Sequence, residues 1–159
     1  MKYKGFWGFI NSTGEEIIIP QYSDATDYKN GYAKVQKYGK YGFIDIHGNV
    51  IIKLDYEHII SGSPDRNYII VAHKGKYGVL NKTGEILIDL KYDLIAPFSD
   101  GYAVVKQNEK YGYINESGEV VISLIYDDAF DFEQSKAKVS KDDNIFYIDK
   151  QGNCVLDCP

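Results

Sequence analysis

A pattern of glycines and aromatic residues recurs along the whole chain, and this repeat restricts the possible folds more than any other feature. Glycine follows an aromatic residue four times, in the pairs Trp7-Gly8, Tyr41-Gly42, Tyr77-Gly78 and Tyr111-Gly112. A second set of glycines, six residues after each of these and once more near the end, comprises Gly14, Gly48, Gly84, Gly118 and Gly152. The intervals within the second set are 34, 36, 34 and 34 residues. Such a period is typical of repeat architectures, in which each unit buries its apolar faces against its neighbours.

The composition indicates that these units consist of strands. The chain has 20 Ile and 10 Val but only 7 Leu, 7 Ala and 1 Met, together with 15 Tyr, 7 Phe and 1 Trp. β-branched and aromatic side chains fit a pleated surface, whereas the scarce residues are those that lose least entropy in helices. We therefore predict an all-β chain, and we exclude a helical bundle and a Rossmann-type enzyme.

Each unit has a turn between its first and second strands, with characteristic residue types at two positions. Asn or Asp occupies the first turn position and Gly the fourth, as Asn11 and Gly14 do in the first unit. A type I turn with a glycine bulge needs this pattern, because the side chain caps the turn and the glycine adopts a positive φ. The pattern predicts five antiparallel hairpins, with turns at 11–14, 45–48, 81–84, 115–118 and 149–152.

Alternation along the strands predicts which faces are buried. Two residues after the glycine of each aromatic-Gly pair, the first strand carries an aliphatic residue, and the fifth unit has one in the same column: Ile10, Ile44, Leu80, Ile114 and Ile148. That face should be core, because residues two apart share a strand face. The opposite face carries a ladder of aromatic residues that begins with Trp7. The second strands are apolar at successive positions, as at 17–19 and 120–122, so we expect both of their faces to be covered.

This combination of motifs resembles the bacterial WG-repeat family. Only Trp7-Gly8 is a literal Trp-Gly pair; Tyr replaces Trp in the next three units, and Ile145-Phe146 stands there in the fifth. We expect a single WG-like repeat domain over residues 1–159, with full repeats beginning near residues 6, 40, 76 and 110 and a terminal half-repeat over 144–159. The resemblance implies a role in binding or scaffolding, and it implies no catalytic residue.

The count of strands bears on how the units are arranged. The chain holds five hairpins of first and second strands but only four complete segments for third and fourth strands. A propeller closes when the two chain ends supply complementary halves of one blade, and here both ends supply the same half. We therefore predict an open, curved, solenoid-like array of antiparallel β-hairpin repeats, with a small β-propeller as the alternative.

Charge and hydropathy limit the partners and the compartment. The net charge is −5 at pH 7, and the basic residues are scattered lysines apart from Arg66, a pattern that excludes nucleic acid as a partner. No apolar run approaches the roughly 18 residues of a membrane span, and no secretory apolar region follows Met1. We expect a cytoplasmic protein by default, although a fragment of a longer exported protein would look the same.

The two cysteines, Cys154 and Cys158, both lie among the last six residues. They could be an ordinary strand residue and a tail thiol, a terminal disulfide, or half of a zinc site. We favour the first interpretation, because a zinc site needs more ligands nearby.

No group of residues indicates catalysis or metal binding. The histidines His47, His58 and His73 occupy unrelated positions of the repeat and have no nucleophile or carboxylate partner in the pattern. A tyrosine with an acid one or two residues after it recurs in the first four units, for example at Tyr92-Asp93, but one or two acids per unit are too few for a calcium loop. We interpret this Tyr-acid step as a turn in which the acid caps backbone amides. We expect no enzyme activity, no cofactor and no metal.

The aromatic residues are the main candidates for binding, because Tyr and Trp offer large, stiff contact areas. The alternative role for any one ring is to fill space between units. The loop over 61–67 breaks the repeat by two residues and holds the only arginine, a departure that could add function or be harmless drift. The candidate binding residues are Trp7, Tyr28, Tyr32, Arg66, Phe98, Tyr102 and Phe132. Those near the loop between third and fourth strands should be partly exposed: Tyr28, Tyr32, Phe98, Tyr102 and Phe132.

We expect from this pattern a non-catalytic module that binds a protein partner through a concave or edge surface of the repeats. Binding of a glycan or a cell-wall polymer through exposed aromatic residues is the alternative.

Overall fold

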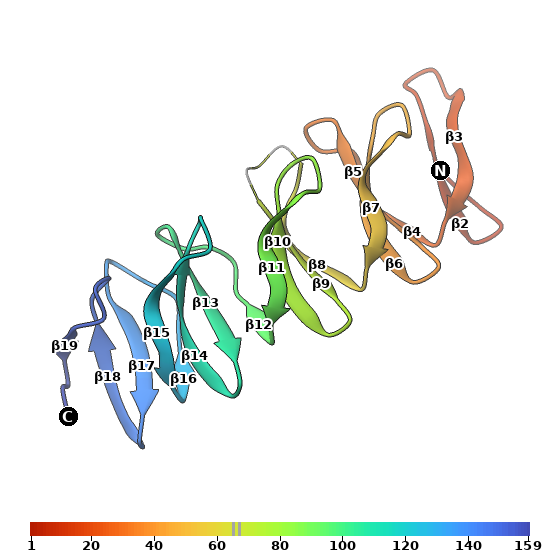
Figure 1. Cartoon of the computed structure of the whole chain (residues 1–159). Helices are drawn as coiled ribbons and strands as arrows, with labels where there is room; N and C mark the ends of the chain where they lie inside the picture. Colours follow the sequence, from red (N-terminus) through yellow and green to blue (C-terminus); the bar gives the residue numbers. More distant parts are fainter. Residues whose placement is uncertain (65, 67) are drawn as a thin grey trace. The chain divides into compact units, whose positions relative to one another are not determined.

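The computed structural model describes residues 1–64, 66 and 68–159, and its regular structure consists of β-strands (Figure 1). The first sheet has three antiparallel strands in the order β1 (Lys2–Tyr3), β2 (Phe6–Ile10), β3 (Glu16–Tyr22). The second has the order β4 (Asp24–Ala25), β5 (Tyr32–Lys37), β6 (Lys40–Asp45), β7 (Val50–Tyr56). The third has the order β8 (His58–Gly62), β9 (Ile69–His73), β10 (Lys76–Leu80), β11 (Ile86–Tyr92).

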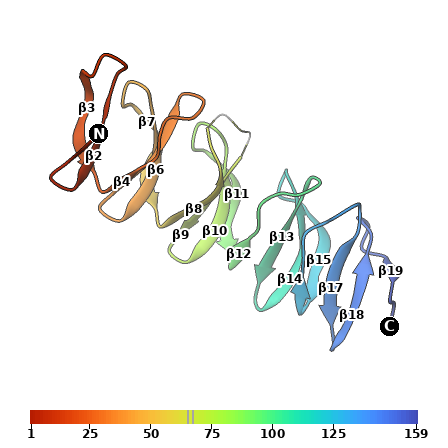
Figure 2. The ribbon, with the colours of Figure 1, turned by 180° about the vertical axis from the view of Figure 1, so that it is seen from behind.

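Two further sheets complete the described chain. The fourth has the order β12 (Leu94–Ile95), β13 (Tyr102–Gln107), β14 (Lys110–Asn115), β15 (Val120–Tyr126). The fifth has the order β16 (Asp128–Ala129), β17 (Ala137–Lys141), β18 (Asn144–Ile148), β19 (Cys154–Leu156). Spatial order equals sequence order in every sheet. Figure 2 shows the same ribbon from behind. The predicted all-β class of tandem antiparallel repeats is confirmed, and no described sheet closes on itself.

The chain divides into two compact units. The first unit comprises Met1–Lys74 and Val79–Ile86, and the second comprises Gly75–Gly78 and Leu87–Pro159. The single domain over 1–159 therefore stays a prediction. The choice between an open array and a small propeller also stays a prediction, since it concerns the placement of these units.

The aromatic-Gly pair marks a close approach between the first and second strands of each hairpin. The pairing of β6 with β7 shifts register between Tyr41 and Phe43, on either side of Gly42. A Cβ atom added to Gly42 would lie 2.4 Å from the carbonyl oxygen of Ile52. Only glycine fits here without moving the second strand, because a real Cβ cannot come so close to a backbone oxygen.

The hairpin turns have the predicted chemistry. The Asn11 side-chain oxygen accepts hydrogen bonds from the backbone amides of Thr13 and Glu15, at 3.0 and 2.9 Å. Gly14 at the fourth position has a φ of +88°, in the region that favours glycine. The same side-chain oxygen caps recur at Asp45, Asn81, Asn115 and Asp149.

The predicted core column is buried in four of the five units. Its residues Ile44, Leu80, Ile114 and Ile148 are inaccessible to solvent, whereas Ile10 is 48% exposed. The aromatic ladder on the opposite face is largely covered: Phe43, Val79 and Tyr113 are buried, and Trp7, Tyr41, Tyr77 and Tyr111 are half-buried.

The expectation that both faces of the second strands are covered is wrong. In each run only one residue is buried, namely Ile18, Ile52, Ile88 and Ile122. Its neighbours are open to solvent, as Ile19 (63% exposed) and Ile86 (57%) demonstrate. Successive residues of a strand point to opposite faces, so this pattern means that β3, β7, β11 and β15 are covered on one face only.

The favoured interpretation of the cysteines is also wrong. Cys154 in β19 and Cys158 form a disulfide, with their Cα atoms 5.7 Å apart. Asp157 has a φ of +55° between them. The chain therefore bends back just after β19, and this bend brings Cys158 within reach of the strand residue.

Candidate binding site

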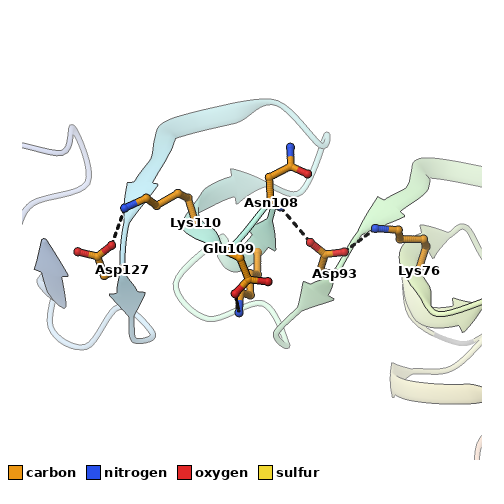
Figure 3. Close-up of polar contacts among 7 residues, drawn as sticks. Lys76, Asp93, Asn108, Glu109, Lys110 and Asp127 are labelled. Carbon is orange, nitrogen blue, oxygen red and sulfur yellow. Dashed lines mark hydrogen bonds and ion pairs between the residues drawn. The ribbon is translucent and has the colours of Figure 1, made fainter.

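Two repeats of the second compact unit show the structural role of the Tyr-acid step (Figure 3). The Asp93 carboxylate accepts hydrogen bonds from the Lys76 ammonium at 2.5 Å and from the backbone amide of Asn108 at 3.0 Å. Asp127 accepts the same pair of bonds from Lys110, at 2.5 Å, and from the amide of Asp142, at 2.9 Å. The interpretation of the acid as a cap for backbone amides is confirmed, with the lysine as an additional partner.

These bonds keep the carboxylates charged. The lysine and amide donors lower the pKa of both the Asp93 and Asp127 carboxyls, since hydrogen bonds from Lys76 and Lys110 favour the ionised form. Where Ser23 replaces the acid in the first repeat, Phe6 replaces the lysine, so both partners are absent together. Within the described chain, no group of three or more His, Cys, Asp or Glu residues could hold a metal ion.

A second repeated contact joins aromatic residues of consecutive sheets. We call the aromatic residue six positions after the tyrosine of each Tyr-acid step the loop ring; these residues are Tyr28, Phe98 and Phe132. In the first unit, the ring of Tyr28 packs on Phe9 of β2 with centroids 4.7 Å apart and planes tilted by 50°. In the second unit, the ring of Phe132 packs on Tyr113 of β14 at 4.9 Å and 55°. Each of these loop rings thus covers a first-strand ring of the preceding sheet.

Phe132 is only 2% exposed, so the expectation that it is partly exposed is wrong. Its ring also packs against Tyr102 at 5.2 Å, and two neighbours on the preceding sheet therefore enclose it. The backbone is held as well, because the Ser99 hydroxyl donates to the Phe132 carbonyl oxygen at 3.2 Å. The other four loop aromatics, Tyr28, Tyr32, Phe98 and Tyr102, are half-buried, as predicted.

The third sheet lacks a loop ring, because Gly62 stands at that position. In this sheet β8, the strand just before the loop, extends over five residues, His58–Gly62, and Gly62 pairs with Ile69 of β9. Gly62 has a φ of +91°, and a Cβ atom there would lie 2.1 Å from the carbonyl oxygen of Tyr68. A side chain is excluded at this position for both reasons, so the loop that breaks the repeat supplies no loop ring to the preceding sheet.

A hollow of about 700 Å³ lies at this place in the first unit. Its apolar lining includes Phe43, Ile59 and Ile60, and the rings of Tyr28 and Tyr32 contribute to its wall. Phe43 is 5% exposed and Ile60 is 42% exposed, so Ile60 and the tyrosines present most of the accessible apolar surface.

Among the described lining residues, cationic side chains outnumber acidic ones. Lys29, Lys34 and Arg66 line the hollow together with one described carboxylate, Asp27. None of these three cations forms an ion pair with a carboxylate within residues 1–64, 66 and 68–159. Asp65 and Asn67 belong to the same loop by sequence and lie outside the described residues.

Tyr28 anchors one wall of the hollow. Its hydroxyl donates to the carbonyl oxygen of Asp45 at 2.9 Å. Burial, with smaller contributions from Asp45 and Tyr22, raises the pKa of Tyr28 to about 12. The phenol therefore stays neutral at physiological pH and serves as a fixed donor rather than as an acid or a base.

The structure brings some predicted site residues together and separates others. Tyr28, Tyr32 and Arg66, from two successive repeats, all line the hollow. Tyr102 and Phe132 contact one another in the second unit, where Phe98 lies in the loop before Tyr102. Trp7 is half-buried in β2, with the Lys2 ammonium 5.1 Å from its ring centroid, and it does not line the hollow.

Sequence reasoning selected none of the other lining residues, among them Lys29, Lys34, Phe43 and Ile60. A signal was present in the sequence. Alignment of the repeats on Tyr22, Tyr56, Tyr92 and Tyr126 places Gly62 in the aromatic column, which marks the one described loop where the ring is missing.

Comparisons with known proteins agree with the repeat pattern. A family model described as "WG containing repeat" matches residues 7–41, 41–77, 77–111 and 111–144. No curated protein is significantly similar to the chain. A solved structure titled "KlHsv2 with loop 6CD replaced by a Gly-Ser linker" has a TM-score of 0.46 and 13% sequence identity, over 82% of this chain and 50% of that one. The chain spans half the length of that structure, and at this level the likeness carries no argument. Among the described residues, no helix is long and apolar enough to cross a membrane.

Proposed function

Since the chain belongs to the WG containing repeat family, we propose that it is a non-catalytic binding module and that its partner is a protein. The hollow lined by Tyr28, Tyr32 and Arg66 is the proposed binding site. It combines the half-buried rings of Tyr28 and Tyr32 with Arg66, and tyrosine and arginine are residue types enriched where proteins bind one another. This gathering of aromatic and cationic residues from two successive repeats is the observation that carries the proposal.

The edge strands give the proposal further support. Exposed apolar residues recur on β3, β7, β11 and β15, including Ile17, Ile19, Val50, Ile86, Leu87, Val120 and Val121. Exposed apolar surface that repeats in the same columns is typical of interaction surfaces, and an edge strand can also accept a strand of a partner. A partner held in the hollow could extend its contact along such an edge.

A site-specific cross-linking experiment tests the proposal. Tyr32 is replaced by a photo-reactive phenylalanine analogue, and the matched control carries the same analogue at Tyr38, which is 91% exposed and does not line the hollow. We expect irradiation in lysate to join a defined protein to position 32 but not to position 38. The cross-link should disappear when Arg66→Glu is added. Equal products at both positions, or products indifferent to Arg66→Glu, would contradict the proposal.

Glycan binding is the second candidate, and the half-buried rings of Tyr28 and Tyr32 in the hollow are the observation that favours it. Tyrosine rings can stack on the apolar face of a sugar. A glycan array separates the two functions: saturable binding of a sugar that Tyr32→Ala abolishes would support this candidate against a protein partner.

A further inference from the structure

We propose that the hollow binds an acidic peptide segment through one aromatic side chain, which takes the place of the missing loop ring. This inference rests on the proposed function, because it names the part of a protein partner that enters the hollow.

The repeats themselves indicate a ring as occupant. Phe132 is enclosed by Tyr102 and Tyr113 of the preceding sheet, at 5.2 and 4.9 Å. The residues in the same repeat positions two repeats earlier in the chain, Tyr32 and Phe43, line the hollow instead. Two walls of an aromatic site are thus present without their own ring. A ring from another chain would make contacts of the kind that the chain makes with its own rings in the other sheets.

The main chain of the occupant also has a partner. Ser99 donates its hydroxyl hydrogen to the carbonyl oxygen of Phe132, the residue that bears the ring. Lys29 stands at the repeat position of Ser99 and lines the hollow. Its ammonium can donate to a peptide carbonyl or to a carboxylate beside the ring. This position favours a peptide over a neutral sugar, which would offer only weaker hydroxyl acceptors.

The cations of the hollow favour acidic residues beside the aromatic residue of the bound peptide. The chain as a whole carries a net charge of −5, yet Lys29, Lys34 and Arg66 meet only Asp27 among the described lining residues. Acidic residues on either side of the aromatic residue would face these cations, and opposite charges across an interface increase the association rate and exclude wrong partners. A basic or neutral segment would gain nothing from them.

Fluorescence polarisation with defined peptides tests the inference on the full chain. The probe is a labelled peptide with one phenylalanine between two pairs of glutamates, flanked by Gly-Ser. We expect saturable binding that falls at least about tenfold when alanine replaces the phenylalanine, because a central aromatic anchor dominates such contacts. Replacing the glutamates by glutamines should weaken binding about tenfold at low salt and less at high salt.

Variants of the chain place the binding in the hollow. Arg66→Ala and Lys29→Ala should each lower the affinity about threefold to tenfold. The matched control, Lys53→Ala, removes an exposed lysine of β7 that does not line the hollow and should leave the affinity unchanged. Equal effects of all three variants would mean non-specific attraction of an acidic peptide, and that result would overturn the inference.

A loop exchange tests the ring site directly. Residues 60–67 are replaced by the six residues 96–101 of the next repeat, which restores the 34-residue period and places the equivalent of Phe98 at the loop-ring position. The matched control carries alanine instead of that phenylalanine. We expect the phenylalanine version to bind no peptide and the alanine version to keep ring-dependent binding, weakened by the loss of Arg66. Equal binding by the two versions would overturn the inference.

The outcomes separate this inference from the proposed function. If no acidic aromatic peptide binds but the cross-link at position 32 still joins a protein and depends on Arg66, the inference fails and the proposed function stands. If neither is observed, or a glycan occupies the hollow, both fail.

Discussion

At the scale of single residues, most repeated columns have a packing reason. The glycine of the aromatic-Gly pair is needed because the second strand passes too close for a side chain, as the 2.4 Å approach of a Gly42 Cβ to the Ile52 oxygen shows. The acid of the Tyr-acid step pairs with a lysine and a turn amide, as Asp93 does with Lys76 and Asn108. Residues that break a column are therefore the informative ones, and Gly62 is such a residue.

Replacing Gly42 by alanine should destabilise the protein strongly. The added methyl group collides with backbone atoms of the second strand, and forcing such an overlap costs about 3 kcal/mol. Gly39→Ala is the matched control: its φ is +77° but nothing lies within 4 Å of an added Cβ, so only about 1 kcal/mol of backbone strain is expected. Urea unfolding of both variants measures the difference. Equal losses would show that the close approach is not the cause.

The carboxylates of the Tyr-acid steps should make stability depend on acid pH. The pKa of Asp93 is lowered in the folded state, chiefly by the hydrogen bond from Lys76, so its contribution is complete above the unfolded value of about 4. The contribution is lost as the pH falls through the lower folded pKa. We expect the wild type to unfold at a higher temperature than Asp93→Asn at neutral pH, with a difference that shrinks below about pH 4.

Thermal unfolding followed by circular dichroism across this pH range measures the effect. Lys76→Met, which removes the donor and keeps the carboxylate, should reproduce the loss at neutral pH. A difference between wild type and Asp93→Asn that stays constant from neutral to acid pH would mean that the ion pair does not contribute through the carboxylate charge.

At the scale of elements, the features that depend on local sequence patterns could be predicted, whereas those that depend on long-range packing could not. The hairpin turns could be predicted because the Asn or Asp cap and the glycine act within four residues, as at Asn11 and Gly14. Burial of the second strands could not be predicted, since the run at 17–19 does not reveal that only one face of β3 is covered by other parts of the chain. Exposure of Phe132 was wrong for a similar reason: its neighbours Tyr102 and Tyr113 lie on the preceding sheet.

The candidate site was predictable only in part. Aromatic chemistry and the irregular loop pointed to Tyr28, Tyr32 and Arg66, and the structure places all three around one hollow. The cation Lys29 and the buried Phe43 carry no sequence signal of their own, because scattered lysines and first-strand aromatics occur in every repeat. The disulfide between Cys154 and Cys158 depends on a bend at Asp157 that no local sequence motif predicts.

The loop exchange should also change stability. With residues 96–101 in place of 60–67, the transplanted phenylalanine can pack beside Tyr32 and Phe43 as Phe132 packs beside its own neighbours. We expect the phenylalanine version to be more stable than its alanine control by about 1.5–3 kcal/mol, the value of burying one such side chain. Urea unfolding of the two full chains measures this difference. Equal midpoints would show that the hollow cannot accept a ring.

At the scale of the whole molecule, the repeat determines how the chain is stabilised. Each sheet consists of strands that are neighbours in sequence, so strand pairing is local. Such chains tolerate changes inside one repeat without loss of the others. A two-residue insertion at 61–67 has therefore been accommodated while the hairpins on either side keep their turns and registers.

The arrangement of the repeats gives the last prediction. The described chain has five hairpins of first and second strands but four segments of third and fourth strands, and from this count we predict an open array rather than a small propeller. A compact chain of 159 residues would have a radius of gyration of about 15 Å. We expect small-angle scattering of the monomer to give a clearly larger radius and an asymmetric distance distribution. A radius near the compact value with a symmetric distribution would indicate the small propeller, because only closure brings the first and last hairpins together.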